Sequence, residues 1–114
     1  MSKVIAVDFD GVIHEYSHGW QKGAIYDPPI KGSLRALKKL MDKGYDIVVF
    51  TARENLDDVR AWLIEEWTKE FSSNPNVTID PKIEVTNIKP KATAYIDDRA
   101  IRFTNWKDML NYFP

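Results

Sequence analysis

The sequence predicts an α/β fold: a three-layer, Rossmann-like parallel sheet with helices on both faces. Two observations lead to this prediction. Short apolar runs rich in β-branched residues, such as Val4–Val7 and Ile47–Phe50, are typical of strands that are covered on both faces. These runs alternate with segments of helical spacing, which favours parallel strands joined by right-handed crossovers. The 114 residues are expected to form one domain, residues 1–114.

The first part of the chain is expected to contain a strand, a loop and a helix. The apolar run of residues 4–7 ends abruptly at Asp8. Residues 12–27 contain glycines and aromatic residues without a helical period, so they predict an irregular loop or small hairpin that Pro28-Pro29 closes. Leucines at helical spacing then predict a helix over Ser33–Lys43, with Ser33 as its N-cap.

The second part of the chain repeats this alternation. The apolar run of residues 47–50 predicts a strand that ends at Thr51, and Asn55 is expected to cap a helix over residues 56–71. A loop rich in Ser, Asn and Pro follows. The remaining predicted elements are strands over residues 83–88, 93–96 and 101–103, and a terminal helix that Asn105 caps and that continues through Phe113.

Composition excludes several classes of function. The absence of cysteine excludes disulfide scaffolds, Cys-ligated zinc and thiol nucleophiles. No apolar run approaches the roughly 20 residues of a membrane span, and Met-Ser-Lys-Val does not begin a signal peptide, so we expect an intracellular, cytoplasmic protein without a membrane partner. The formal net charge of −1 does not favour nucleic acid as a partner, although a local basic patch would still allow it.

Polar side chains suited to phosphate chemistry follow the predicted strands. Because the carboxyl ends of parallel strands meet at one edge of a sheet, we expect these side chains to lie together. Clustered carboxylates repel one another, and a divalent cation such as Mg²⁺ would relieve that repulsion. A lysine and a hydroxyl could bind the remaining phosphate oxygens, as phosphoryl transfer requires. The residues are Asp8, Asp10, Thr51, Arg53, Lys89, Asp97 and Asp98.

Asp8 and Asp10 could divide the chemistry between them. Asp8 could attack phosphorus and form an aspartyl-phosphate, while Asp10 could protonate the leaving oxygen and then take a proton from water. Gly11 suits a tight turn against the phosphate, because glycine adopts a positive φ and places no side chain in the way. Alternatively, both acids are ordinary turn residues after a strand.

Four segments resemble the motifs of the haloacid dehalogenase superfamily of phosphohydrolases. Val7-Asp8-Phe9-Asp10-Gly11-Val12 resembles its first motif, Phe50-Thr51-Ala52-Arg53 its second, Lys89 its third and Ile96-Asp97-Asp98-Arg99 its fourth. They occur in the order of the family, and the resemblance covers nearly the whole chain. It implies a capless member, in which residues 12–27 form the flap that gates the site. It also implies that the Asp97 strand and the Thr51 strand flank a central Asp8 strand.

The resemblance assigns the acidic residues to catalysis and to Mg²⁺. Asp8 would be the nucleophile and a metal ligand. Asp10 would be the general acid and base, and its backbone carbonyl would bind the metal. Asp97 would bind Mg²⁺ directly, and Asp98 directly or through water.

The resemblance assigns a second group of residues to the phosphate. Thr51 would bind it through its hydroxyl and Ala52 through its amide, while Lys89 would hold the nucleophile and the phosphate together. Lys91 is the alternative motif lysine, but Lys89 precedes a proline, as the family's lysine often does. Arg53 would either contact substrate or pair with a helix acid.

The flap residues and the substrate are less well defined by the sequence. We expect His14 and His18 to be solvated, and Trp20 either to anchor the flap or to stack on a base or sugar. The expected function is Mg²⁺-dependent hydrolysis of phosphomonoesters. One alternative is a nucleic-acid 3′-end phosphatase, because the fourth motif also resembles the phosphatase half of polynucleotide kinases. Another is a non-catalytic module that binds phosphate or a partner. The sequence does not identify the substrate or decide whether a homo-oligomer covers the open site.

Overall fold

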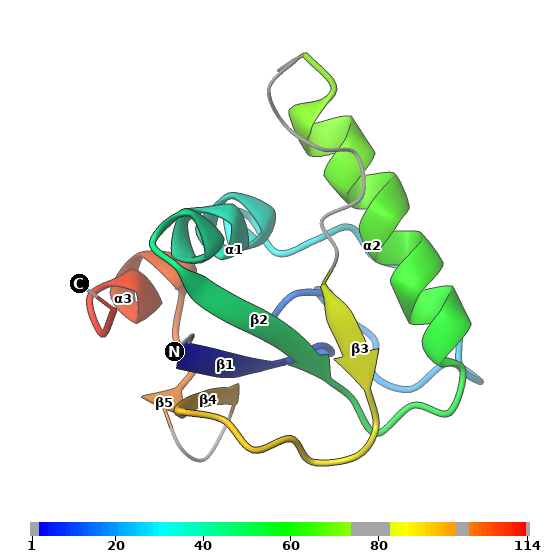
Figure 1. Cartoon of the computed structure of the whole chain (residues 1–114). Coiled ribbons are helices and arrows are strands. Elements are labelled where there is room, and N and C mark those ends of the chain that lie inside the picture. Colours follow the sequence, from blue (N-terminus) through cyan, green and yellow to red (C-terminus); the bar gives the residue numbers. More distant parts are fainter. Residues whose placement is uncertain (1–2, 74–82, 98–100, 114) are drawn as a thin grey trace.

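Five parallel strands form the centre of the structure, a computed structural model that describes residues 3–73, 83–97 and 101–113 (Figure 1). The sheet order is β3-β2-β1-β4-β5. This arrangement confirms the predicted α/β class, and it places the strand of Asp97 and the strand before Thr51 on the two sides of the central strand. The strands are β1 (Lys3–Asp8), β2 (Tyr45–Phe50), β3 (Glu84–Thr86), β4 (Ala94–Asp97) and β5 (Ile101–Arg102).

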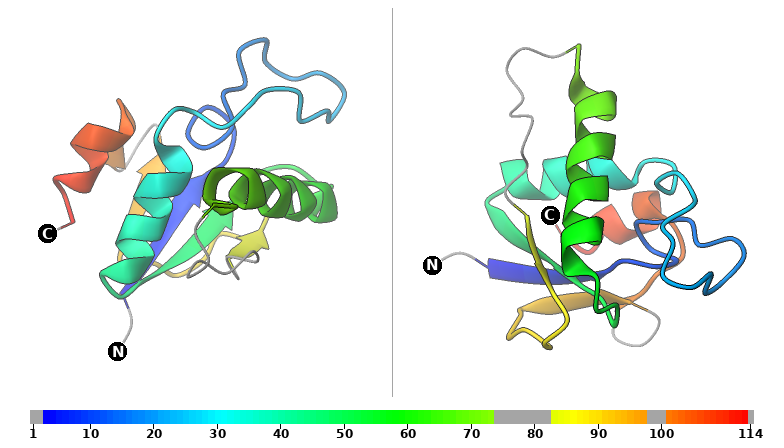
Figure 2. Two further views of the ribbon diagram at one scale, coloured as in Figure 1. Left: turned by 90° about the horizontal axis from the view of Figure 1, so that it is seen from above. Right: turned by 90° about the vertical axis from the view of Figure 1, so that its right-hand side faces the viewer.

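In the described part of the chain, the helices lie on one face of the sheet (Figures 1 and 2). They are α1 (Ser33–Asp42), α2 (Leu56–Phe71) and α3 (Trp106–Leu110), and α3 packs beside α1. This corrects the prediction of helices on both faces. The segment of residues 87–93 crosses the other face from β3 to β4 (Figure 1), and it is shorter than the dozen or so residues that a helical crossover needs.

Side chains alternate between the two faces of the central strand. Ile5 and Val7 are fully buried and belong to the core beneath the helices. Ala6 alternates to the opposite face, where it is also buried. Continuing this alternation, Asp8 at the end of β1 lies on the face that carries the 87–93 segment rather than on the helical face.

The N-cap positions agree with the sequence in two of three cases, whereas α3 ends at Leu110 and not at Phe113 as predicted. Asn105 caps α3, because its Oδ1 accepts a hydrogen bond from the Asp108 N–H at 2.8 Å. Asn55 occupies the N-cap position of α2, but its side chain accepts no hydrogen bond from a backbone N–H of the first turn; instead its Nδ2 donates to the Asp58 carboxylate at 3.2 Å. The N-cap of α1 is Gly32 instead of Ser33, because the chain enters the helix through a left-handed residue with φ of 83°.

The flap, residues 12–27, forms no strand or helix and projects beyond the carboxyl end of β1 (Figure 2). Isolated bridges from Asp10 to His14 and from His14 to Pro29 hold its base. The helices of the described residues are all too short or too polar to cross a bilayer.

Candidate functional site

The parallel strands bring three of the predicted site positions to one edge of the sheet. Asp8 ends β1 and is aligned with Phe50, the residue before Thr51. Val7 is aligned with Ile96 of β4, so positions 8 and 97 end neighbouring strands, whose backbones are about 4.8 Å apart. We call positions 8, 51 and 97 the strand-end edge.

Asp8 is half-buried at this edge, and its Oδ1 accepts a hydrogen bond from the Phe9 N–H at 2.8 Å. Carboxylates on adjacent strand ends are suitable donors for a hard divalent cation. Among the side chains that the structure describes, no three acidic or histidine groups converge on one point. Asp98 and the side chain of Asp97 lie outside the described part, so the Mg²⁺ site stays a prediction that rests on the strand ends.

Hydrogen bonds to β3 and within the loop itself hold the loop after β2 in place. The buried Thr51 donates its N–H to the Thr86 carbonyl at 3.0 Å, and its Oγ accepts from the Arg53 N–H at 3.2 Å. A hydroxyl can donate as well as accept, so the Thr51 O–H can still turn toward a phosphate oxygen. The next residue, Ala52, is exposed.

Lys89 lies on the segment that crosses the face opposite the helices. Its Nζ is 5.1 Å from the centre of the Tyr95 ring, and Tyr95 is aligned with Ala6 of β1. Ala6 and Asp8 share a face of the sheet, so Lys89 is on the same side as Asp8. The exposed Lys91 follows on the same segment, and the choice of Lys89 as the motif lysine stays a prediction.

Asp10 is engaged by two buried side chains. Its two oxygens accept from Arg53, at 2.8 Å from Nε and 3.0 Å from Nη2, and Oδ1 is also 2.8 Å from Nδ1 of His14. The side chain of Arg53 is only 2% exposed. Arg53 therefore pairs with Asp10 and not with a helix acid, which corrects that alternative, while contact of Arg53 with substrate stays a prediction. We call Asp10, His14 and Arg53 the flap anchor.

Arg53 also ties the flap to the loop after β2. Its Nη1 donates to the Gly23 carbonyl at 2.7 Å. The guanidinium lies between two aromatic rings, with Cζ 5.8 Å from the centre of Phe9 and 5.1 Å from that of Trp20. At the other end of the anchor, Gly11 has a φ of 80° and donates its N–H to the His14 carbonyl at 2.8 Å, which confirms the predicted tight turn.

His14 corrects the prediction of a solvated histidine, because it is completely buried. Its Nε2 is 3.0 Å from the backbone nitrogen of Asp27. A backbone N–H can only donate, so Nε2 must be unprotonated, and the ring proton of the neutral imidazole is on Nδ1, where it donates to Asp10. The ring also stacks on Phe9 at 5.4 Å. In the sequence His14 simply stands in a glycine-rich loop, where no period indicates burial.

Asp27, the last residue of the flap, holds the end of the flap in place. Its Oδ2 accepts from both the Oγ–H and the N–H of Ser17, each at 2.6 Å. These hydrogen bonds from Ser17 hold the pKa of the Asp27 carboxyl below its ordinary value. His18 is exposed, as predicted, and its ring stacks on that of Tyr26.

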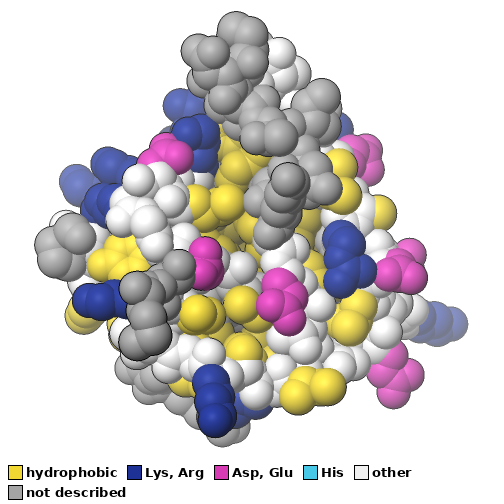
Figure 3. Space-filling view, viewed as in Figure 1, with side chains coloured by type: hydrophobic (Ala, Val, Ile, Leu, Met, Phe, Trp, Pro, Cys, Tyr) yellow, Lys and Arg dark blue, Asp and Glu magenta, His cyan; other side chains and the backbone are white. Residues whose placement is uncertain are grey.

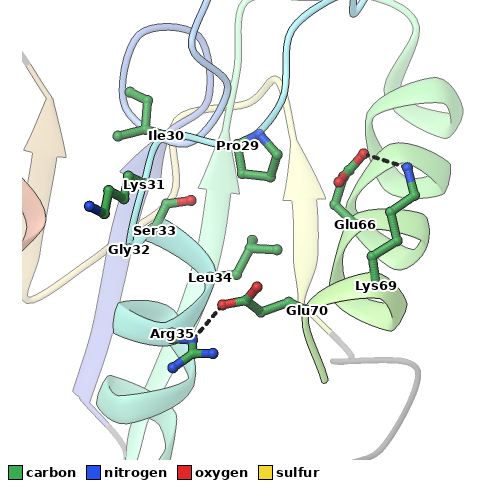
Figure 4. Close-up of a pocket in the computed structure, with 10 residues that line it drawn as sticks. All are labelled: Pro29, Ile30, Lys31, Gly32, Ser33, Leu34, Arg35, Glu66, Lys69 and Glu70. Carbon is green, nitrogen blue, oxygen red and sulfur yellow. Dashed lines mark hydrogen bonds and ion pairs between the residues drawn. The ribbon is translucent and has the colours of Figure 1, made fainter. Parts of the chain in front are cut away.

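A separate hollow lies between the start of α1 and the side of α2 (Figure 4). Two ion pairs cross or border it: Arg35 with Glu70 at 2.6 Å and Lys69 with Glu66 at 3.2 Å. Ser33 lines the hollow, and its Oγ is buried without a hydrogen-bond partner. Of the predicted site residues that the structure describes, none lines this hollow.

Comparison with known proteins extends the description of the fold. No protein-family model and no curated protein matches the chain. A solved structure, described as a conserved protein coded by a locus from Bacteroides thetaiotaomicron, is similar with a TM-score of 0.59 and 22% sequence identity. The similarity covers 96% of this chain and 87% of that one. It supports the α/β fold over nearly the full length.

Proposed function

We propose that this protein is a Mg²⁺-dependent phosphohydrolase that cleaves phosphomonoesters through an aspartyl-phosphate on Asp8. The observation that carries the proposal is the strand-end edge, where Asp8, Thr51 and Asp97 follow or end three adjacent parallel strands. This is the edge at which α/β sheets bind their ligands. Three of the segments that resemble motifs of the haloacid dehalogenase superfamily thus end neighbouring strands, which supports the proposal.

The first step would belong to Asp8. Its carboxylate attacks phosphorus, a bond forms between the Asp8 oxygen and phosphorus, and the bond from phosphorus to the ester oxygen breaks. The Phe9 N–H on Oδ1 would keep the carboxylate oriented during the attack. Mg²⁺, held by Asp8, Asp97, Asp98 and the Asp10 carbonyl, would neutralise the charge that meets there.

The second step would use Asp10 as a base. Water attacks the phosphorus of the aspartyl-phosphate and gives its proton to Asp10, the bond between the Asp8 oxygen and phosphorus breaks, and inorganic phosphate departs. Arg53 and the Nδ1–H of His14 both donate to Asp10 and fix the orientation of its carboxylate. In the first step Asp10 would act as the acid and protonate the leaving oxygen. Esters with stable leaving groups, such as aryl phosphates, should therefore depend least on Asp10.

Replacement of the nucleophile tests the proposal. Asp8→Asn keeps the shape of the side chain and an acceptor for the Phe9 N–H, and it should lower kcat on an aryl phosphate by at least roughly 10³-fold. The matched control is Asp46→Asn on the exposed side of β2, which should leave kcat unchanged. Chelation of Mg²⁺ should abolish activity and its return should restore it. Undiminished hydrolysis by folded Asp8→Asn protein would refute the proposal.

The flap anchor favours one second candidate, a non-catalytic module that binds phosphate. Asp10 is held in an ion pair with a buried arginine, as a residue of purely structural importance would be. Phosphate binding without release of phosphate from any ester, in the presence of Mg²⁺, would favour this candidate.

A nucleic-acid 3′-end phosphatase has less support. The chain has a formal net charge of −1, and Figure 3 shows basic and acidic side chains interspersed over one face of the molecule. A path for a polyanionic strand would need a run of positive charge. A 3′-phosphorylated oligonucleotide should therefore be hydrolysed no faster than a mononucleotide.

A further inference from the structure

Trp20 is an exposed indole at a fixed position on the flap. The residue is 59% exposed, yet one face of its ring stands over the guanidinium of Arg53 at 5.1 Å. The edge of the ring lies against Gly23, where a Cβ atom would meet it at 3.8 Å. The indole is therefore packed on one side and open on the other, which is the arrangement of a stacking platform.

The support beneath the indole is rigid. Arg53 is held by Asp10 and by the Gly23 carbonyl, and its guanidinium is sandwiched between the rings of Phe9 and Trp20. Phe9 is completely buried. A ligand that stacks on Trp20 would thus meet a surface already ordered by the core, with little entropy left to lose.

A hollow of about 770 Å³ extends from this platform to Ala52, whose amide is one of the predicted phosphate ligands. Trp20 and Lys22 line it on the flap side, and Ala52 and Asn55 line it on the side of the loop after β2. Ala52 directly follows Thr51, so a phosphate at the strand-end edge would have its ester group beside this hollow.

The polar rim limits the kind of ligand. Lys22 is opposed by Glu54 and Asp58 on the same rim, and the charge of Arg53 is balanced by Asp10. A rim of this kind does not attract a long polyanion. It suits a ligand with one phosphate and one planar ring whose polar edge can meet carboxylates and an amide.

We propose that this hollow is the leaving-group subsite and that it selects phosphomonoesters carrying a planar nitrogen heterocycle, the nucleoside monophosphates. The inference rests on the proposed function and adds the substrate class to it. Trp20 supplies the stacking surface, and Arg53, which also lines the hollow, supports that surface.

Truncation of the indole tests the subsite. Trp20→Ala should lower kcat/KM for a nucleoside monophosphate by roughly 10- to 100-fold, the usual effect of losing one stacked base. The same variant should change kcat/KM for glycerol phosphate by less than about threefold, because this ester has no ring to stack on the indole. Trp20→Phe should restore most of the loss. Tyr112→Ala removes another exposed aromatic side chain and should leave kcat/KM unchanged for both substrates.

A binding measurement separates failure of the subsite from failure of the proposed chemistry. Titration of the Asp8→Asn protein with a nucleoside monophosphate should give an affinity that falls when Trp20→Ala is added. If this holds while no ester is hydrolysed by the unmodified protein, the subsite stands and the proposed function fails. If hydrolysis occurs but Trp20→Ala affects both substrates equally, or neither, the subsite is refuted and the proposed function stands.

Discussion

The strand-end edge and the flap anchor are neighbours in the chain but differ in their surroundings. Asp10 belongs to the anchor and accepts hydrogen bonds from two side chains that are almost completely buried. Asp8 belongs to the edge, where it is half-buried and ends a strand beside position 97. The partly buried Asp10 carboxylate pairs with a buried arginine and so helps to hold the flap, whereas acids gathered at a strand end suit a cation and a phosphate. The two acids of one motif therefore serve the protein differently.

The first prediction separates these two roles. Asp10→Asn should lower kcat by roughly 10²- to 10⁴-fold, as expected for loss of a general acid or base. It should also lower the free energy of unfolding by about 3 kcal/mol, because Arg53 is left buried without its counter-ion. Urea unfolding and steady-state kinetics measure the two effects. An unchanged free energy of unfolding would show that the anchor does not stabilise the fold.

Removal of both charges sharpens this test. In the double variant Asp10→Asn with Arg53→Met, no unpaired charge is buried, so part of the lost stability should return. Activity should not return with it, because Asp10 is still absent. A double variant less stable than Asp10→Asn would mean that the bonds from Arg53 to the flap carbonyls matter more than the ion pair.

The edge could be predicted from the sequence, whereas the anchor could not. Apolar runs define β1, β2 and β4, and their parallel order places Asp8, Thr51 and Asp97 together without knowledge of any side-chain contact. The partner of Arg53 depends instead on the path of an irregular loop, and no period in the sequence encodes that path. The burial of His14 could not be predicted from the sequence for the same reason.

The number of helical layers could not be predicted from alternation alone. Alternating strands and helices imply a right-handed crossover at each step, but a crossover requires enough residues to form a helix. The segment of residues 87–93 has too few, so it crosses the sheet as an extended connection. Segment length, which the sequence does contain, was the signal that would have corrected the prediction.

The second prediction concerns the histidine of the anchor. His14→Phe keeps a ring that can stack on Phe9, but it removes the bonds to the Asp10 carboxylate and the Asp27 N–H. The free energy of unfolding should fall by about 2 kcal/mol, because those buried groups lose a partner. Hydrogen exchange at the Asp27 amide should accelerate. His18→Phe, at an exposed position of the same flap, should change neither quantity.

The third prediction concerns the buried hydroxyl of Ser33. Unlike the side chains of the flap anchor, it has no hydrogen-bond partner among the described residues. The Ser33 Oγ has no hydrogen-bond partner, so Ser33→Ala should raise the free energy of unfolding by about 1 kcal/mol, as the cost of burying an unpaired hydroxyl disappears. Ser17→Ala gives the comparison with an exposed hydroxyl that has a partner, and it should lower the free energy of unfolding because the Ser17 hydroxyl donates to Asp27. The midpoint of urea unfolding measures both changes. A loss of stability in Ser33→Ala would mean that this hydroxyl is bonded after all, for example to a water molecule in the hollow between α1 and α2. The contrast between partnered and unpartnered buried groups would then no longer explain why Asp10 and His14 hold the flap so firmly.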